Sequence, residues 1–303
     1  MKFTTSVNLG NFLKDYSLAD SLKMIRECGF DGVDFSLWYF CQGDDAPMYK
    51  DNWREFIADV RRMLDENGLC VPQAHAHWRH EGQVQEDFSY ALPGEIFERN
   101  IEACRMLGCD KLVFHPIQHF FPLKNVAETR KKVIEANAAW FKALMPAAEK
   151  YNVQLLVENM FDYKHIQAMD APAIPMSQGA DLMEVIEKVN HPLMRICLDT
   201  GHANIAGADV PEMIRLFGDH LRAVHLQDNY GKIYPVYEDI HQFPGTCSLD
   251  WEAIFKALKE TGCDVSLNME LSAKLAKQPR PIQVHRYVSG RELLTLMAKI
   301  YTA

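Results

Sequence analysis

The stretch AAEKYNVQLLVEN, residues 147–159, contains one complete helix-to-strand unit. A helical pattern ends at Asn152, a residue type that takes the left-handed conformation found after a helix C-terminus. The short apolar run that follows is typical of a strand buried in a parallel sheet. This run ends in Glu158, and a buried charge is costly unless it is paired or bound to a metal. The stretch therefore predicts a β/α fold with a functional group at the strand end.

The same unit recurs along the chain. Four more stretches combine a helical pattern, a glycine suited to a positive φ and an apolar run: residues 24–35, 63–77, 103–116 and 257–271. With the remaining apolar runs they predict strands near residues 3–9, 32–37, 71–77, 111–116, 153–159, 195–200, 222–228 and 265–271. Helical patterns fill the gaps, including a capping box at Ser17 and Asp20 and an amphipathic segment over 127–150. We expect an α/β protein, a (β/α)8 TIM barrel forming one domain over residues 1–303, with a longer final segment at about 272–303.

Ligand-type side chains stand at the ends of four predicted strands: Glu158, Asp199, His225 and Glu270. The C-terminal ends of barrel strands converge at one mouth, and alternate residues point inward. Carboxylate and imidazole groups together suit a divalent cation. We therefore expect these residues to bind one divalent metal ion, whether Mn, Mg, Zn or Co.

Further residues are expected at the same level: His75, His77, His115, His202, Asp239 and His241. His115, His202, Asp239 and His241 are each, taken alone, more typical of structural or solvated residues, but the joint placement of all six indicates an enlarged site. His75 and His77 are two residues apart in a predicted strand, so they should share a face. His75, His115, Asp239 and His241 are candidate metal or substrate ligands, and the candidates for substrate contact are His77, Trp78, Trp38 and Phe243. Core packing is the alternative for the aromatic residues.

The charge, the cysteine pattern and the hydropathy of the chain disfavour several classes of protein. The net charge of −9 disfavours a nucleic-acid partner, and the loops after the second and third predicted strands are acidic. The eight cysteines form no CxxC pair, so we expect reduced thiols. The sequence contains no candidate membrane span and its start lacks a signal-peptide pattern, so a cytoplasmic location is expected.

Several motifs resemble those of the xylose-isomerase-like TIM-barrel superfamily over nearly the whole chain: QAHAHW, LVFHP, LLVEN, CLDTGHANIAG, VHLQDN, DIHQFPGTCSLDW and NMEL. That group includes sugar and sugar-phosphate isomerases, ketose 3-epimerases, inosose dehydratases and metal-dependent apurinic-site endonucleases. The resemblance implies that the four strand-end residues form the shared metal site. It also implies that five residues fall where the endonucleases hold further zinc ions: His75, His115, His202, Asp239 and His241. One departure is the pair His77 and Trp78, where relatives have proline and an aromatic residue.

These features favour a metal-dependent isomerase or epimerase acting on a sugar or sugar phosphate, through proton abstraction beside a carbonyl and a metal-stabilised enediolate. Glu158 and Glu270 come from strands across the barrel, so we expect one to remove a proton and the other to return it. His202 either polarises a substrate oxygen or binds a second ion with Asp239 and His241.

The alternatives are an inosose-type dehydratase, an apurinic-site endonuclease and a non-enzymatic metal sensor. The acidic loops disfavour the endonuclease, because phosphate groups would be repelled. The expected partner is a small sugar-like molecule, with neither nucleic acid nor membrane. The resemblance implies a homodimer or homotetramer.

Overall fold

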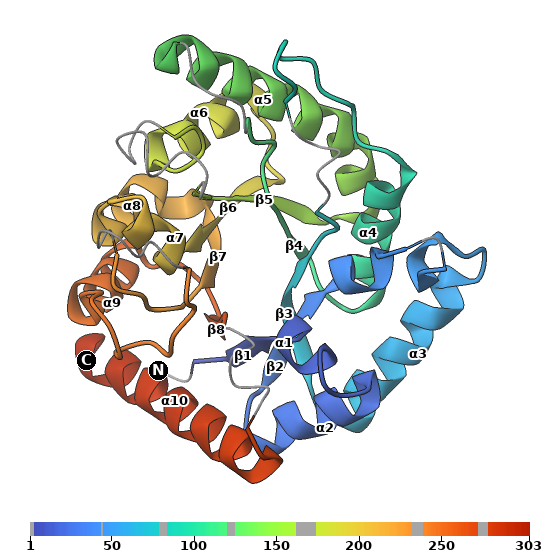
Figure 1. Cartoon of the computed structure of the whole chain (residues 1–303), viewed down its shortest axis with the longest axis vertical. Coiled ribbons are helices and arrows are strands. Elements are labelled where there is room, and N and C mark those ends of the chain that lie inside the picture. Colours follow the sequence, from blue (N-terminus) through green and yellow to red (C-terminus); the bar gives the residue numbers. More distant parts are fainter. Residues whose placement is uncertain are drawn as a thin grey trace.

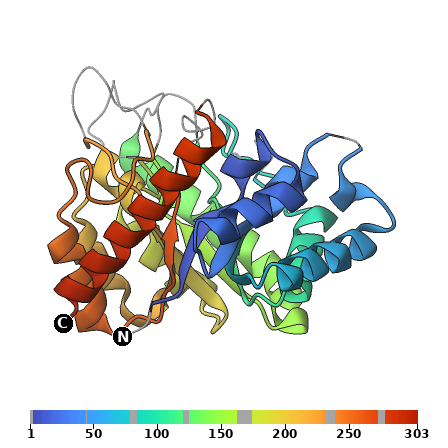
Figure 2. The ribbon, with the colours of Figure 1, turned by 90° about the horizontal axis from the view of Figure 1, so that it is seen from below.

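The chain folds into a barrel of parallel strands surrounded by helices (Figures 1 and 2). The structure, a computed structural model, describes residues 3–43, 45–78, 84–119, 125–161, 174–231, 239–271 and 278–303. One sheet of eight strands has the order β7-β6-β5-β4-β3-β2-β1-β8. Leu226, just after β7, forms a parallel bridge with Met269 of β8, so the two edges of the sheet meet. The predicted (β/α)8 barrel is confirmed.

The strands alternate with helices along the described chain. The strands are β1 Thr5–Asn8, β2 Gly32–Ser36, β3 Cys70–His75, β4 Lys111–Phe114, β5 Gln154–Glu158, β6 Met194–Asp199, β7 Leu221–His225 and β8 Leu267–Met269. The α-helices are α1 Gly10–Leu13, α2 Leu18–Glu27, α3 Trp53–Glu66, α4 Glu95–Met106, α5 Val126–Tyr151, α6 Gly179–Val189, α7 Thr200–Ile205, α8 Val210–Phe217, α9 Trp251–Thr261 and α10 Arg280–Tyr301. Short 3-10 helices are η1 Leu37–Cys41, η2 Pro47–Tyr49 and η5 Gly218–His220.

The residues predicted to end the helices do so. Asn152 and Gly262 follow α5 and α9 in the left-handed conformation, with φ of 52° and 65°. Glycines at the matching position of three other units also have positive φ: Gly29, Gly68 and Gly108. The Ser17 side chain accepts a hydrogen bond from the backbone N–H of Asp20 at 3.2 Å and caps α2. Local signals therefore determine where each helix gives way to the next strand.

Several strands end earlier than the sequence patterns indicate. Strand β3 ends at His75 instead of residue 77, and β7 ends at His225 instead of residue 228. The predicted ends are wrong here because apolar residues beyond the strands, such as Ala76 and Leu226, are buried without continuing the regular ladder. An apolar pattern indicates that residues are buried, and residues in the segments just beyond a strand can be buried as well. The pattern therefore does not show where the strand ends.

The final part of the chain completes the outer ring. Helix α10 lies between α9 and α2 (Figure 1), and Arg280 at its start donates a hydrogen bond to Glu27 of α2. Residues 272–277 of the expected longer final segment lie outside the described residues. Among the described helices, none combines the length and apolar character needed to cross a membrane. All eight cysteines are described and are free thiols, as predicted.

Asp228 organises the segment that follows β7. Its buried carboxylate accepts hydrogen bonds of 2.9 to 3.2 Å from the backbone N–H groups of Asn229, Gly245, Thr246, Cys247 and Leu249 and from the indole of Trp251. The backbone of Asp228 also pairs with Gln242 in an antiparallel bridge. These bonds fold residues 239–250 back over the barrel, which brings Asp239 and His241 toward the strand ends.

We expect Asp228→Asn to lower the free energy of unfolding by about 3 kcal/mol, because its amide nitrogen would face N–H groups that now have a carboxylate oxygen as acceptor. Urea denaturation measures the change. The matched control is Asp250→Asn, since Asp250 caps α9 by accepting from the backbone N–H of Ala253 and asparagine caps equally well. Equal stability losses in the two variants would contradict this role of Asp228.

Candidate metal centre

Four ligand-type residues meet at the mouth of the barrel and are called here the primary cluster: Glu158, Asp199, His225 and Glu270. The first three are the last residues of β5, β6 and β7, and Glu270 directly follows β8. Each offers one ligand atom, and these atoms all lie within 4.8 Å of one another. Nδ1 of His225 is 2.8 Å from Oε1 of Glu158 and 2.9 Å from Oε2 of Glu270. The residues predicted to share a metal site are therefore brought together.

The primary cluster is rich in buried negative charge. Burial alone would raise the pKa of Glu158, but the neighbouring His225 and His115 hold it well below its usual range. Burial likewise opposes ionisation of Glu270, yet the His225 imidazolium lowers the pKa of Glu270 to about 2. Burial raises the pKa of Asp199 to about 6, although His202 acts in the opposite direction. Closely spaced carboxylates of this kind are stabilised by a nearby cation.

The unsatisfied atoms of the cluster also fit a bound cation. Oε2 of Glu270 is buried and makes no hydrogen bond of normal geometry within the described part of the chain, although Nδ1 of His225 is close. Such an oxygen is costly to bury without a partner. Three carboxylates and one imidazole form an oxygen-rich donor set that suits a divalent ion.

A second cluster shares Glu158 with the first and consists of His75, His115 and Glu158. Nε2 of His75 and Nε2 of His115 each lie 3.4 Å from Oε2 of Glu158. Burial would lower the pKa of His75, but Asp34 and Glu158 raise it to about 10. Burial lowers the pKa of His115 to about 4, because its carboxylate neighbour only partly compensates. Glu158 thus faces two groups of candidate ligands.

A third cluster consists of His202, Asp239 and His241. Nε2 of His202 lies 3.5 Å from Oδ2 of Asp239, and Nε2 of His241 is hydrogen-bonded to the same oxygen. Nδ1 of His202 lies 3.0 Å from the backbone oxygen of Asn159. When the ring is neutral, Nδ1 can donate its proton to this oxygen, and Nε2, which faces Asp239, is then unprotonated. His202 therefore lies with the other members of the third cluster, and which of its two predicted roles it takes stays a prediction.

Four polar residues at the site were not predicted from the sequence as site residues: Asp34, Gln73, Gln227 and Asn268. The amide nitrogen of Gln227 donates to Oδ1 of Asp199 at 3.2 Å and to Oδ1 of Asp239 at 3.0 Å, and so lies between the first and third clusters. Asp34 lies in β2, within GVDFS, and is fully buried. An acidic residue inside an apolar run was the available signal for Asp34, and it differs from the strand-end position that identified Glu158.

A pocket of about 260 Å³ opens beside the primary cluster. Its lining includes Glu270, His115, Trp38 and Trp78. The Trp78 ring centroid lies 5.6 Å from that of Trp38 and also stacks on His115 at 5.6 Å, with 20° between the ring planes of Trp78 and His115. Two of the predicted substrate-contact residues therefore form an aromatic wall next to the candidate ligands.

His77 and Phe243 lie elsewhere. Strand β3 ends at His75, so the regular alternation on which the predicted shared face of His75 and His77 rests does not extend to His77. The His77 ring is 5.9 Å from Phe97 of α4, and Phe243 packs near Tyr287 of α10 with ring centroids 6.0 Å apart. Neither residue is among those that line the described pocket, and their substrate contact stays a prediction.

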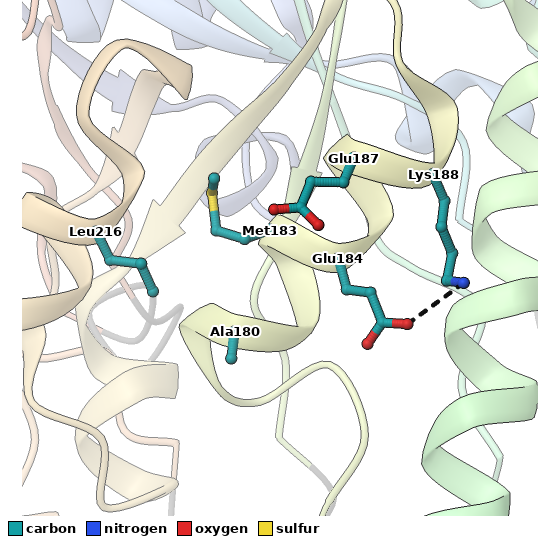
Figure 3. A pocket seen from close by; sticks show the side chains of 6 residues that line it. All are labelled: Ala180, Met183, Glu184, Glu187, Lys188 and Leu216. Atoms are coloured by element: carbon teal, nitrogen blue, oxygen red, sulfur yellow. Dashed lines mark ion pairs between the residues drawn. The ribbon is translucent and has the colours of Figure 1, made fainter.

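A larger hollow of about 640 Å³ lies on the outer ring, between α6 and α8 (Figure 3). Its lining includes Met183 and Leu216 and an ion pair of 3.4 Å between Glu184 and Lys188 within α6. Such a pair on one helix face is typical of a solvated surface. The lining supplies no described group of candidate metal ligands, so the barrel mouth is the better candidate for chemistry.

The fold and the site together define a class: a parallel (β/α)8 barrel with carboxylate and imidazole side chains gathered at the C-terminal strand ends. The chain belongs to the family described as xylose isomerase-like TIM barrel, whose model matches residues 22–286. The resemblance drawn from the sequence is confirmed.

Individual relatives include sugar epimerases. The chain is 25% identical over 287 residues to a putative L-ribulose-5-phosphate 3-epimerase of Escherichia coli (strain K12), with 92% of each chain covered. It is 26% identical over 182 residues to a probable endonuclease 4 of Halorhodospira halophila (strain DSM 244 / SL1), covering 56% of this chain and 57% of the relative. The solved structure of an L-ribulose 3-epimerase matches with a TM-score of 0.71 and 21% identity, covering 99% and 96% of the two chains. The predicted class of enzyme, an isomerase or epimerase, is confirmed at that level.

Proposed function

We propose that the protein is a metal-dependent isomerase or epimerase of a sugar or sugar phosphate. The observation that carries this proposal is the position of Glu270, which belongs to the primary cluster and also lines the aromatic pocket. A substrate in that pocket would meet a carboxylate and the metal ligands together. The similarity to a putative sugar-phosphate epimerase supports the same chemistry.

The two glutamates differ in their access to the pocket. The Glu270 side chain is 19% exposed, whereas that of Glu158 is 1% exposed beneath it. Glu270 is therefore the better candidate to remove the proton beside the carbonyl, and Glu158 is the candidate to return it as well as a ligand. A divalent ion held by Glu158, Asp199, His225 and Glu270 would supply positive charge against the charge that develops on the substrate oxygens.

The pocket favours a small polar substrate. Its volume lies just below the roughly 300–1,000 Å³ of pockets that hold drug-sized ligands. Asn8, Asn11 and Ser36 line it and offer hydrogen-bond partners for hydroxyl groups, while Trp38 and Trp78 offer apolar faces. Lys14 also lines the pocket and could pair with a phosphate, so both neutral and phosphorylated sugars remain candidates.

The three clusters make an apurinic-site endonuclease the second candidate, because a phosphodiesterase commonly uses several ions. The partial similarity to a probable endonuclease 4 supports it. The negative net charge and acidic loops oppose it, although residues 44 and 79–83 of those loops lie outside the described residues. The sugar enzyme is the better supported proposal, because the pocket is small and has aromatic walls.

Proton exchange in deuterated water tests the proposal. The metal-loaded protein is incubated with a panel of ketoses, aldoses, their phosphates and inosose, and NMR follows deuterium entry beside the carbonyl. We expect metal-dependent exchange with at least one ketose or its phosphate. Dehydration of inosose would favour the dehydratase alternative. Cleavage of abasic DNA, without exchange in any sugar, would contradict the proposal.

A further inference from the structure

Asp34 lies beneath the metal ligands, inside the barrel. It is fully buried in β2, and one of its oxygens, Oδ2, faces two imidazoles. Nδ1 of His75 lies 3.3 Å from this oxygen, and Nε2 of His225 lies 3.4 Å from it. The opposite ring nitrogens point toward Glu158, at 3.4 Å from His75 and 2.8 Å from His225. One carboxylate thus lies behind a candidate ligand of each of two clusters.

Polar neighbours hold Asp34 in this position. The side-chain amides of Gln73 and Asn268 each donate to Oδ2 at 3.2 Å. Asn268 is held in turn by Ser6, whose hydroxyl donates to it at 2.9 Å. The interior near β8, β1, β2 and β3 is therefore polar, whereas strands β4 to β7 contribute a separate apolar group of Val113, Leu156, Cys197 and Ala223. Polar residues concentrated on one side of a barrel interior indicate a role other than packing.

A cation bound beside Glu158 would select one tautomer of each imidazole. With a cation on the nitrogens that face Glu158, each ring would carry its proton on the nitrogen that faces Asp34. That nitrogen is Nδ1 in His75, which is hydrogen-bonded to Asp34, and Nε2 in His225, which lies 3.4 Å from Asp34 without hydrogen-bond geometry among the described residues. Such a carboxylate behind a metal-binding histidine fixes the ring and increases its basicity. Here one carboxylate would serve two rings, whose centroids are 4.6 Å apart with 25° between their planes.

We propose that Asp34 is a positioning residue that holds His75 and His225 in the tautomer and orientation needed for metal binding, and so supports two neighbouring ion positions. This inference rests on the proposed metal centre. A different arrangement, with an ion bound directly among Asp34, His75 and His225, is compatible with the spacing of their ligand atoms. The two arrangements predict different numbers of bound ions when the charge of Asp34 is removed.

The variant Asp34→Asn separates charge from hydrogen bonding. The side-chain amides of Gln73 and Asn268 and the imidazoles of His75 and His225 all face Oδ2 of Asp34. The other oxygen, Oδ1, is buried without a hydrogen bond among the described residues. An asparagine can therefore keep its carbonyl oxygen where Oδ2 stands and lose only the negative charge. Affinity for Zn²⁺ and Co²⁺ is measured by chelator competition, with the visible spectrum of the Co²⁺ form as a readout of ligand geometry.

We expect Asp34→Asn to bind Co²⁺ and Zn²⁺ roughly 10- to 100-fold more weakly, with unchanged stoichiometry and an altered Co²⁺ spectrum. The control Ser6→Ala changes the same polar region without touching Asp34, and should keep the wild-type affinity and spectrum. An Asp34→Asn affinity within twofold of wild type overturns the proposal, and so does the loss of one whole ion per chain. If the wild-type protein binds no divalent ion, the proposed function fails as well.

Discussion

Replacing Glu270 by glutamine should reduce solvent-deuterium exchange at the substrate carbon by about 10²- to 10⁴-fold, the usual contribution of a general base. The amide cannot accept the proton, yet it has almost the same size and retains an oxygen that can bind a cation. The fold should survive, because the contact between His241 and Glu270 involves the backbone oxygen of Glu270. Exchange is measured by NMR at saturating metal, and circular dichroism checks the fold.

Two further variants make the result specific. Glu187→Gln carries the same chemical change on the outer surface beside α8 (Figure 3) and should leave exchange unchanged. Glu270→Asp keeps a carboxylate but withdraws it, so partial activity is expected. Undiminished exchange in a folded, metal-loaded Glu270→Gln protein would contradict the role of Glu270 as a base.

Removing the metal should lower the melting temperature by about 4 °C relative to protein held at a metal concentration of roughly 100 times the dissociation constant. Binding at that concentration stabilises the folded state by about 2.7 kcal/mol. For 303 residues the entropy of unfolding is about 0.64 kcal/mol/K, which converts this energy into the expected shift. Differential scanning calorimetry with and without a chelator measures it.

The variant Glu158→Gln tests which residues cause that stabilisation. Glu158 belongs to two clusters and contacts His75, His115 and His225, so its charge should matter more for metal binding than that of any peripheral residue. We expect the metal-dependent rise in melting temperature to disappear in this variant. Glu187→Gln should keep the full rise. A chelator that leaves the melting temperature of the wild-type protein unchanged would argue against a metal in the folded core.

The barrel, and the meeting of Glu158, Asp199, His225 and Glu270 at its mouth, could be predicted from sequence for a physical reason. Asn152 and the helix-ending glycines determine local backbone conformation, and they mark the entry to β2, β3, β4, β5 and β8 without reference to the rest of the chain. Glu158 stood out because a charged residue at the end of a buried strand needs a partner. In a parallel barrel the C-terminal ends of the strands meet, so the sequence alone is enough to group such residues.

Other parts of the site depend on contacts between distant segments. His77 lies two residues beyond the end of β3, and its neighbour Phe97 belongs to a helix that the strand pattern does not position. Gln227 acquires its role only when the segment carrying Asp239 folds back over the barrel. Asp34 was visible as an acid in an apolar run, but its two imidazole partners come from β3 and β7. Sequence patterns alone could not determine these pairings.

The proposed division of roles between the two glutamates follows from their depth. Glu270 reaches the pocket, whereas Glu158 is surrounded by imidazoles from several strands. A substitution at Glu270 should therefore affect proton transfer more than metal content, and a substitution at Glu158 should do the reverse. Comparing exchange rate and metal content in the two glutamine variants separates a base from a ligand, although each residue is expected to contribute to both functions.

Anomalous diffraction from crystals of the Zn²⁺-loaded protein, collected at the zinc edge, tests the metal centre most directly. We predict a strong peak among Glu158, Asp199, His225 and Glu270, with ligand atoms at about 2.0–2.2 Å. Additional peaks at the His75–His115 and His202–Asp239–His241 clusters would indicate further ions. Loaded crystals with no peak at the primary cluster, or with zinc bound only elsewhere, would contradict the account.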